Sequence, residues 1–213
     1  MKEVFVYVEG PSDQLGLRML LKNIIKKSQQ QGNKLDFFPL GGKEPLLNKG
    51  PLKAINILCN KPHSFVFLVP DLYPKNTPFK HENFEELKKE IECRFFKELE
   101  KKHYDKRIKE RFFIHCFKYD FESLLLATET NLLNRLNAKK CTAKWIIPVE
   151  NQNFNKPPKR IVELLFKNEG KKYKDTIDAP WILEQTDYKD LYIKCNQNFK
   201  PFIDDLLKIL EIN

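Results

Sequence analysis

The sequence predicts an α/β fold, in which a mainly parallel central sheet is flanked by helices and followed by a C-terminal helical elaboration. Short apolar runs alternate with amphipathic helical patterns over about the first 130 residues, which is typical of strands joined by helical crossovers. The first run, residues 4–8, is continuously apolar, as expected for a strand buried on both faces of a parallel sheet. Three of the runs lead directly into acidic residues, at the strand ends where open α/β sheets place their ligand sites.

The first part of the chain predicts two strand–helix units. The strand at residues 4–8 is followed by a helix over about residues 12–27, whose apolar side chains recur at helical spacing. A second short strand is expected at residues 35–40, followed by the flexible loop 41–43. Pro51 can then occupy the first turn of the next helix.

The middle of the chain continues the alternation. A third strand is expected at residues 64–69, followed by the proline-rich loop 70–78. A long helix over about residues 82–102 has apolar residues on one side and dense charge on the other, so its charged face should be solvated. The fourth strand is expected at about residues 111–117, and a helix begins near Phe121.

The C-terminal part has a weaker pattern. Residues 137–159 show no clear periodicity, and helices are expected at about residues 158–168 and 199–210. We therefore divide the chain into a core over residues 1–130 and a helical elaboration over residues 131–213.

Composition and charge limit the classes of function. A chain of 213 residues can bury one good core. Its net charge of +9, from 38 Lys and Arg against 29 Asp and Glu, favours polyanionic partners such as nucleic acid. A Lys- and Asn-rich composition would give the same excess without such a partner, so charge alone leaves both explanations open.

Several other classes are disfavoured. The five cysteines are scattered without a C-x-x-C spacing, and the four histidines do not pair at ligand spacing, which argues against zinc ribbons, redox motifs and His/Cys metal sites. No apolar run approaches the ~18 residues of a membrane helix, and the N-terminus reads as a strand rather than as a signal peptide. We therefore expect a cytoplasmic protein with no membrane association.

The acids that follow the predicted strands are the most informative feature. They are Glu9 after the first strand, Asp13 one helical turn later, Asp71 after the third strand, and Asp120 and Glu122 after the fourth. Neighbouring parallel strands lie ~4.8 Å apart, so acids at adjacent strand ends can share a divalent cation. An oxygen-rich, His-poor set favours Mg²⁺ or Mn²⁺ over zinc, and such ions can promote phosphodiester hydrolysis. The five acids therefore predict a metal site.

Most of these acids also have a simpler interpretation. Asp13 can complement the positive N-terminus of the first helix, and Asp120 can cap the helix that begins at Phe121. Asp71 can belong to a proline-containing turn. Glu9 has no obvious capping role, because it closes a buried strand beside a Gly-Pro turn.

Three cations are candidates for holding phosphate groups. Lys43 follows two glycines, whose backbone freedom would allow close approach to a polyanion. Lys159 and Arg160 precede a predicted helix and could neutralise charge that develops on a scissile phosphate, which makes Lys159 a catalytic candidate. The alternative is that all three are ordinary surface cations. Tyr73 and Phe79, in the loop after the third strand, are candidates for stacking on an exposed base.

Three segments resemble motifs of the TOPRIM domains found in topoisomerases, primases and overcoming-lysogenization-defect (OLD) nucleases. They are Val8-Glu9-Gly10-Pro11-Ser12-Asp13, which resembles the first motif, Val69-Pro70-Asp71-Leu72-Tyr73, at the place of the Asp-x-Asp motif, and Tyr119-Asp120-Phe121-Glu122-Ser123-Leu124-Leu125, which resembles the acidic Asp-x-Glu region of OLD-type nucleases. Over roughly residues 4–205 the chain also resembles a family of small TOPRIM-like bacterial proteins, with which it shares Gly41-Gly42-Lys43 and Pro157-Pro158-Lys159-Arg160-Ile161.

The resemblance implies a TOPRIM-like, Rossmann-like core. It implies that Glu9 is a metal ligand or the general acid/base, that Asp71 is a metal ligand, and that Asp120 and Glu122 complete the site. One departure is that Tyr73 stands where the second acid of Asp-x-Asp would be. Because a tyrosine cannot replace a carboxylate, the site then depends on Glu122.

The leading hypothesis is a Mg²⁺- or Mn²⁺-dependent nuclease that hydrolyses DNA or RNA phosphodiesters as the effector of a phage-defence system. Related small proteins are often encoded beside ABC-type or AAA-type ATPases, so the resemblance implies an ATPase partner. The chain has no P-loop motif, so ATP hydrolysis would have to come from that partner. The sequence is also compatible with a homo-oligomer.

Two alternatives remain open at this point. Tyr73 supports a non-catalytic module with a degenerate metal site that binds nucleic acid or an ATPase. A deep pocket beside Glu9 would instead favour a metal-dependent phosphatase or nucleotide hydrolase that acts on small substrates.

Overall fold

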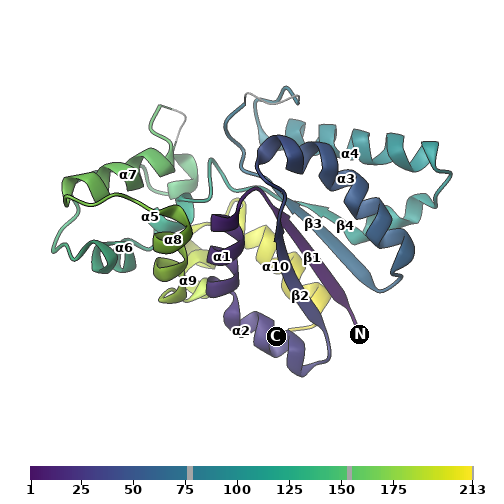
Figure 1. The fold of residues 1–213 in the computed structure, drawn as a ribbon, viewed down its shortest axis with the longest axis horizontal. Coiled ribbons are helices and arrows are strands. Elements are labelled where there is room, and N and C mark those ends of the chain that lie inside the picture. Colours follow the sequence, from purple (N-terminus) through teal and green to yellow (C-terminus); the bar gives the residue numbers. More distant parts are fainter. Residues whose placement is uncertain (76–78, 153–154, 213) are drawn as a thin grey trace.

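The structure is a computed structural model that describes residues 1–75, 79–152 and 155–212. Within these residues the centre is a four-stranded sheet of strand order β2-β1-β3-β4, in which all neighbouring strands are parallel (Figure 1). The strands are β1 (Glu3–Val8), β2 (Lys34–Pro39), β3 (Ser64–Val69) and β4 (Phe112–Ile114). The predicted α/β fold with a parallel central sheet is therefore confirmed.

The carboxyl ends of the strands meet at one edge of the sheet. Val8, the last residue of β1, pairs with Pro39 of β2 and with Val69 of β3. The chain after β4 stays beside β3, since Asp71 forms a parallel bridge with Phe117. Three segments therefore leave the sheet at the same edge, immediately before the acids that the sequence singles out.

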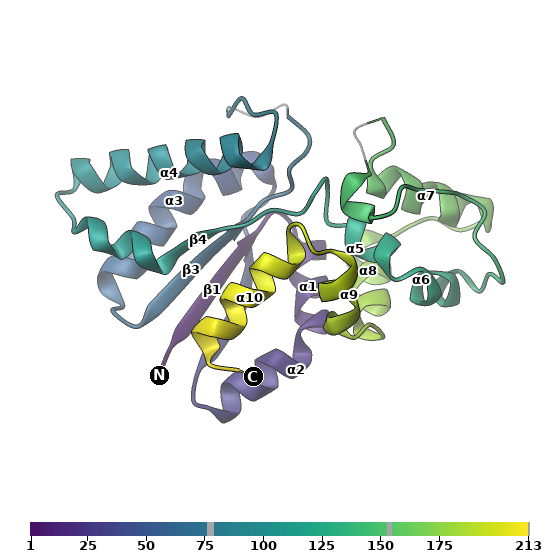
Figure 2. The same cartoon turned by 180° about the vertical axis from the view of Figure 1, so that it is seen from behind.

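Helices cover both faces of the sheet (Figures 1 and 2). The helices nearest to it are α1 (Pro11–Leu20), α2 (Lys22–Gln30), α3 (Lys43–Asn60), α4 (Phe84–Lys101) and α10 (Phe199–Leu210). Side chains of β1 alternate between two cores, because successive residues of a strand point to opposite faces. Val6 belongs to the core shared with α1 and α10, whereas Tyr7 belongs to the core shared with α3 and α4.

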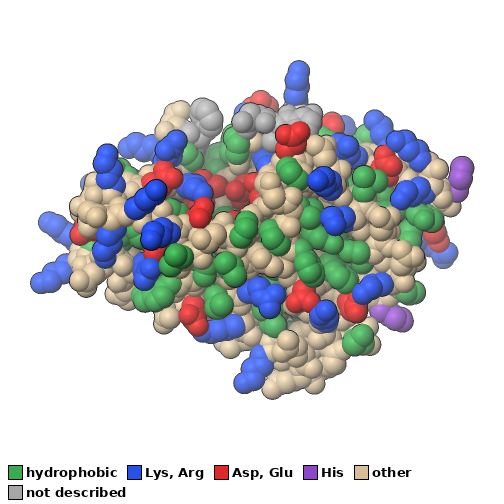
Figure 3. Space-filling model, in the orientation of Figure 1, with side chains coloured by type: hydrophobic (Ala, Val, Ile, Leu, Met, Phe, Trp, Pro, Cys, Tyr) green, Lys and Arg blue, Asp and Glu red, His purple; other side chains and the backbone are tan. Residues whose placement is uncertain are grey.

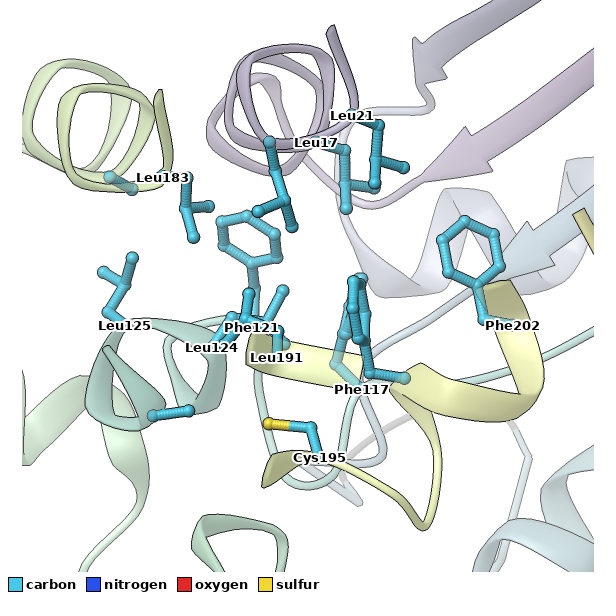
Figure 4. Close-up of a cluster of buried hydrophobic side chains, with 14 of the residues drawn as sticks. Leu17, Leu21, Phe117, Phe121, Leu124, Leu125, Leu183, Leu191, Cys195 and Phe202 are labelled. Atoms are coloured by element: carbon cyan, nitrogen blue, oxygen red, sulfur yellow. The ribbon is translucent and has the colours of Figure 1, made fainter. Parts of the chain in front are cut away.

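The remaining α-helices form a helical lobe beside α1 (Figure 1). They are α5 (Ser123–Ala127), α6 (Glu129–Leu136), α7 (Pro158–Asn168), α8 (Asp175–Glu184) and α9 (Tyr188–Lys194). Gly16 allows α1 to approach this lobe, because a Cβ at that position would lie 2.6 Å from the ring of Phe121. Figure 4 shows Leu17 of α1 and Leu183 of α8 on either side of that ring.

Two 3₁₀ helices complete the described elements, at Lys106–Arg111 (η1) and Val149–Asn151 (η2). The expected division at residue 130 falls inside α6, and α10 returns from the C-terminal part to pack against the sheet. Side chains from both sides of that division therefore share one hydrophobic core.

Several elements differ from their expected form. The first helix is divided at Leu21 into α1 and α2, and α3 begins at Lys43 instead of Pro51, which lies inside it. Strand β4 is shorter than expected, and α6, α8 and α9 were not predicted. Among the described residues, no helix combines the length and the apolar character that crossing a membrane requires.

Candidate functional site

A cavity of about 620 Å³ lies at the carboxyl edge of the sheet. Its lining includes all five acids that the sequence predicts as metal ligands, which are Glu9, Asp13, Asp71, Asp120 and Glu122. Lys159 and Arg160 of α7 also line it. Figure 3 shows acidic side chains in a hollow near the centre of the view, between the helical lobe and the side of α3 and α4. The sheet edge therefore brings together residues that are far apart in the sequence.

Glu9 is held where β1 ends by contacts to its backbone and its side chain. Its carbonyl oxygen accepts hydrogen bonds from the N–H groups of Gly41 (3.0 Å) and Gly42 (2.7 Å). Both glycines have positive φ angles, of 85° and 116°, a region that residues with a Cβ rarely adopt. The Glu9 Oε1 accepts a hydrogen bond from the N–H of Asp71 at 2.9 Å. The carboxyl group therefore joins the ends of β1 and β3.

Asp71 and Asp120 each have an oxygen atom that lacks a partner. Asp71 Oδ1 and Asp120 Oδ1 are both buried, and neither has a hydrogen-bond partner within the described part of the chain. Buried polar atoms are normally satisfied in folded proteins, so two orphaned carboxylate oxygens in one cavity need an explanation. The other Asp120 oxygen, Oδ2, accepts a hydrogen bond from the backbone N–H of Lys159 at 3.2 Å.

That hydrogen bond corrects one of the simpler interpretations. Asp120 does not cap a helix beginning at Phe121, because α5 begins at Ser123 and its N-terminus has no side-chain cap. Asp120 instead contacts the first turn of α7, which starts at Pro158. The positive end of that helix favours a negative charge on Asp120.

Glu122 and Lys159 form the other side of the cavity. Lys159 Nζ lies 3.5 Å from Glu122 Oε1 and 3.2 Å from Asp175 Oδ2. The hydroxyl of Tyr173 donates a weak hydrogen bond to Glu122 Oε1, with 3.4 Å between the oxygens. Burial alone would lower the pKa of Lys159, but Glu122 and Asp175 outweigh it and raise that pKa above its ordinary value. Lys159 therefore stays charged beside the acids.

Asp13 has a structural role at the N-terminus of α1, as its simpler interpretation predicts. Its Oδ2 accepts a hydrogen bond from the N–H of Gly10, the N-cap of α1, at 3.0 Å. Its Oδ1 accepts one from the hydroxyl of Ser12, also at 3.0 Å. Both oxygens of Asp13 are therefore engaged at the N-terminus of α1, although the side chain still lines the cavity.

The carboxyl groups share an unusual electrostatic environment. Burial, together with the nearby charge of Asp13, raises the pKa of Glu9 from 4.5 to about 8, against the opposing effects of the Asp71 N–H and Lys43. Burial and the charge of Glu9 hold the pKa of Asp71 well above its ordinary value, and burial and Glu122 do the same for Asp120. Burial also raises the pKa values of Asp13 and Glu122. Strongly raised carboxyl pKa values in a cavity mark a candidate functional site.

The donor set suits a hard divalent cation, although the side chains are not arranged as ligands. Across the described residues, no group of three or more Asp, Glu, His or Cys side chains is placed so that it could hold a metal ion as it stands. A physical reason is that several acids point towards protein donors, as Glu9 does towards the Asp71 N–H and Glu122 towards Lys159. The two orphaned oxygens of Asp71 and Asp120 nevertheless fit a cation, because Mg²⁺ and Mn²⁺ prefer carboxylate oxygens.

The three predicted phosphate-binding cations have different positions. Lys159 and Arg160 line the cavity, where Arg160 also pairs with Glu163 at 3.2 Å. Lys43 does not take the expected position, because it is only 7% exposed and its Nζ donates hydrogen bonds to the carbonyl oxygens of Leu72 and Pro74, each at 2.8 Å. Its side chain fastens the segment after β3, so contact with a phosphate is not its role in this structure.

The two aromatic candidates also differ. Tyr73 lines the cavity and stacks on Tyr119, with 4.6 Å between ring centroids and 26° between ring planes. Phe79 is 7% exposed and packs in the core formed with α3 and α4. Only Tyr73 is therefore placed where a base could reach it.

Sequence reasoning missed four residues around the cavity: Tyr119, Glu163, Tyr173 and Asp175. Tyr119 carries a weak signal, since it directly precedes Asp120. Tyr173 lies between α7 and α8, and Asp175 is the first residue of α8, in a part of the chain where neither periodicity nor a motif points to the sheet edge.

Comparison with known proteins adds the family. No curated protein and no solved structure matches the chain. A family model described as a domain of unknown function (DUF4276) matches residues 8–207. The matched range begins at the last residue of β1 and includes all five cavity acids and both cavity cations of α7. The chain therefore belongs to the DUF4276 family.

Proposed function

We propose that the protein is a Mg²⁺- or Mn²⁺-dependent phosphodiesterase of TOPRIM-like type, which hydrolyses DNA or RNA. The observation that carries this proposal is the meeting of five carboxyl groups in one cavity, where buried oxygens of Asp71 and Asp120 have no partner within the described residues. Such a set is expensive to bury unless a cation compensates it, because like charges at short range raise one another's pKa values.

Asp71, Asp120 and Glu122 would hold the ion, together with Glu9 when its carboxyl group is ionised. When bound, a divalent cation would polarise a phosphoryl oxygen and lower the pKa of a coordinated water molecule. Glu9, with a pKa of about 8, could take up or release a proton near neutral pH, as a general acid or base must. Lys159 would neutralise negative charge that develops on the phosphate.

The resemblance to OLD-type nucleases extends the proposal to biological context. We further propose that the protein acts in the cytoplasm as an effector of phage defence, together with an ABC-type or AAA-type ATPase, and that it can form a homo-oligomer. The sequence supports the need for a separate ATPase, because it lacks a P-loop motif.

The cavity itself favours a second candidate, a metal-dependent phosphatase or nucleotide hydrolase. A volume of about 620 Å³ is large enough for a nucleotide-sized ligand. The stacked rings of Tyr73 and Tyr119 at this cavity could contact a nucleobase. This candidate uses the same carboxyl groups on a small substrate.

One experiment separates these functions. The purified protein is incubated with Mg²⁺, Mn²⁺ or EDTA and with single- and double-stranded DNA, RNA, nucleotides and p-nitrophenyl phosphate. We expect metal-dependent cleavage of a nucleic acid, with loss of activity in Glu9→Gln and Asp71→Asn. The matched controls are Glu98→Gln and Asp105→Asn, which alter acids of α4 and of the turn before η1 that do not line the cavity. Binding without cleavage would indicate a non-catalytic module, and cleavage of small esters alone would indicate a phosphatase.

A further inference from the structure

The net positive charge of the chain is concentrated in one segment of the helical lobe. Residues 135–174 contain eleven Lys and Arg but three Asp and Glu, so this segment has a net charge of +8 out of +9 for the chain. The segment spans the end of α6, α7 and the loops beside them. Figure 3 shows Lys and Arg side chains over the part of the view where Figure 1 places α6 and α7. The remainder of the chain is nearly neutral, and residues 175–194 of the same lobe carry five Asp and Glu against two Lys, so the charge is a local property of the segment 135–174.

Most cations of this segment have no acidic partner. Among the described residues, an ion pair within 4.0 Å is found for Arg135, Lys159 and Arg160 but not for the exposed lysines of the segment. These lysines are Lys139, Lys140, Lys144, Lys156, Lys167, Lys171, Lys172 and Lys174. Elsewhere some lysines pair, as Lys61 does with Glu3 and Lys109 with Glu92. Uncompensated like charges repel one another, so their clustering favours an external anion.

Helix α7 connects this charge with the cavity. Its first turn carries Lys159 and Arg160 at the cavity, and its last residue, Asn168, donates a hydrogen bond to Thr142 at 3.1 Å. The exposed lysines of the far end are Lys167, in the last turn of α7, and Lys139, Lys140 and Lys172, in the loops on either side of that contact. A helix of 11 residues spans about 16 Å, which corresponds to roughly five phosphates along one strand of a duplex.

The charge of the cavity explains why such a surface would be needed. Six acids line the cavity, the five that the sequence predicts and Glu163, against two cations, Lys159 and Arg160. Once ionised, these acids would repel a polyanion that approached without a bound cation. Attraction at a distance must therefore come from outside the cavity, and the basic segment 135–174 meets the cavity at Lys159 and Arg160.

We propose that the lysines at the far end of α7 and along its flanking loops form a docking surface for the phosphate backbone of a nucleic acid, which reaches the cavity along α7. This inference rests on the proposed function for its substrate, but the docking itself requires neither a metal ion nor cleavage. Lysine ammonium groups at such a surface would contact phosphates, so binding should depend on salt and only weakly on base sequence.

The test compares two variants that each lose four exposed lysines. The lobe variant is Lys139→Gln, Lys140→Gln, Lys167→Gln and Lys172→Gln. The control is Lys49→Gln, Lys53→Gln, Lys89→Gln and Lys97→Gln, which removes the same charge from α3 and α4. Binding of a fluorescent oligonucleotide is measured by anisotropy in EDTA at several salt concentrations. Circular dichroism shows that both variants are folded.

We expect the lobe variant to bind at least tenfold more weakly and to lose about 2–3 units from the slope of log K against log salt, since each phosphate contact on a single strand contributes ~0.7. The control should stay within about twofold of the wild type. Equal weakening in both variants would mean that total charge matters rather than this surface, and no weakening in either would also overturn the inference. Lobe-dependent binding of phosphatidylglycerol vesicles without binding of nucleic acid would overturn it as well.

Failure of the docking surface can be distinguished from failure of the proposed function. If the wild type binds through the lobe but cleaves nothing with Mg²⁺ or Mn²⁺, the docking surface stands and the phosphodiesterase fails. If cleavage of the oligonucleotide is unchanged in the lobe variant, the docking surface fails and the phosphodiesterase stands. The lobe variant should also retain its thermal shift with Mn²⁺, because none of its four substitutions is in the cavity.

Discussion

The carboxyl group of Glu9 accepts a hydrogen bond from the backbone N–H of Asp71, with 2.9 Å between N and Oε1. The two residues follow neighbouring parallel strands, so this contact closes the sheet edge at the floor of the cavity. It gives Glu9 a structural role beside its proposed catalytic role, and substitutions can separate the two.

Glu9→Gln should abolish activity without unfolding the protein. A glutamine keeps a carbonyl oxygen that can accept the Asp71 N–H, but it cannot ionise or ligate a cation strongly. Glu9→Ala leaves that N–H without its partner and should also lower the free energy of unfolding by about 1–3 kcal/mol. Urea unfolding and cleavage assays measure the two effects. A fully active Glu9→Gln variant would rule out the catalytic role.

The raised carboxyl pKa values predict an unusual dependence of stability on pH. Between the ordinary pKa of Glu9, 4.5, and its pKa of about 8 in the folded protein, the folded state binds more protons than the unfolded state. The free energy of unfolding without metal should therefore be greatest below this window and fall as pH rises through it. Thermal unfolding in EDTA between about pH 5 and pH 8 measures this loss of stability as a fall in Tm.

A divalent cation should reverse that trend. It binds the ionised carboxyl groups, so the increase in Tm on adding Mg²⁺ or Mn²⁺ should be larger at the upper end of the window than at the lower end. The Asp105→Asn variant should behave as the wild type. A metal-induced shift that is the same at both pH values would contradict the raised pKa values.

Lys43→Met tests whether this lysine fastens a loop or binds phosphate. The ammonium group donates to the carbonyl oxygens of Leu72 and Pro74, so its loss should destabilise the protein by about 1–3 kcal/mol. Hydrogen exchange should accelerate near residues 71–75, while the salt dependence of oligonucleotide binding should not change. The control is Lys49→Met, at an exposed site on the same helix. A reduced salt slope with normal stability would restore the predicted phosphate contact.

Glu150 provides a prediction that is independent of the cavity. This side chain is 2% exposed and accepts hydrogen bonds from the N–H groups of Gln197, Asn198 and Phe199 at the start of α10. Its replacement by Ala leaves these donors buried and should cost about 2–4 kcal/mol of stability. Glu110→Ala, at an exposed position, should cost less than about 0.5 kcal/mol. Urea unfolding that gives equal values for the two variants would refute this account of Glu150.

The sequence predicted the parts of the site that depend on local pattern. Apolar runs mark β1 and β3, and parallel strands necessarily end at one edge, so Glu9 and Asp71 could be expected to be neighbours. Asp120 and Glu122 follow β4 in the same way, although the strand itself is shorter than its apolar run.

Other features depend on long-range packing that no local pattern encodes. Lys43 was misplaced because the Gly-Gly-Lys sequence gives no sign that α3 begins at Lys43 and directs its ammonium group to Leu72 and Pro74. Asp175, the first residue of α8, pairs with Lys159 at the cavity. Helix α8 packs beside α1, where Gly16 leaves room for Phe121 and Leu183.

Binding of Mn²⁺ tests the central claim most directly, because it requires neither a known substrate nor activity. Isothermal titration calorimetry compares the wild type with Asp71→Asn, Asp120→Asn and the control Glu98→Gln. The pH is about 8, where protonation of the carboxyl groups competes least with metal binding. We expect the wild type and the control to bind Mn²⁺ with the same affinity, and the two cavity variants to bind at least tenfold more weakly. Equal Mn²⁺ affinity in all four proteins, or no binding to the wild type, would contradict a metal site built on these acids.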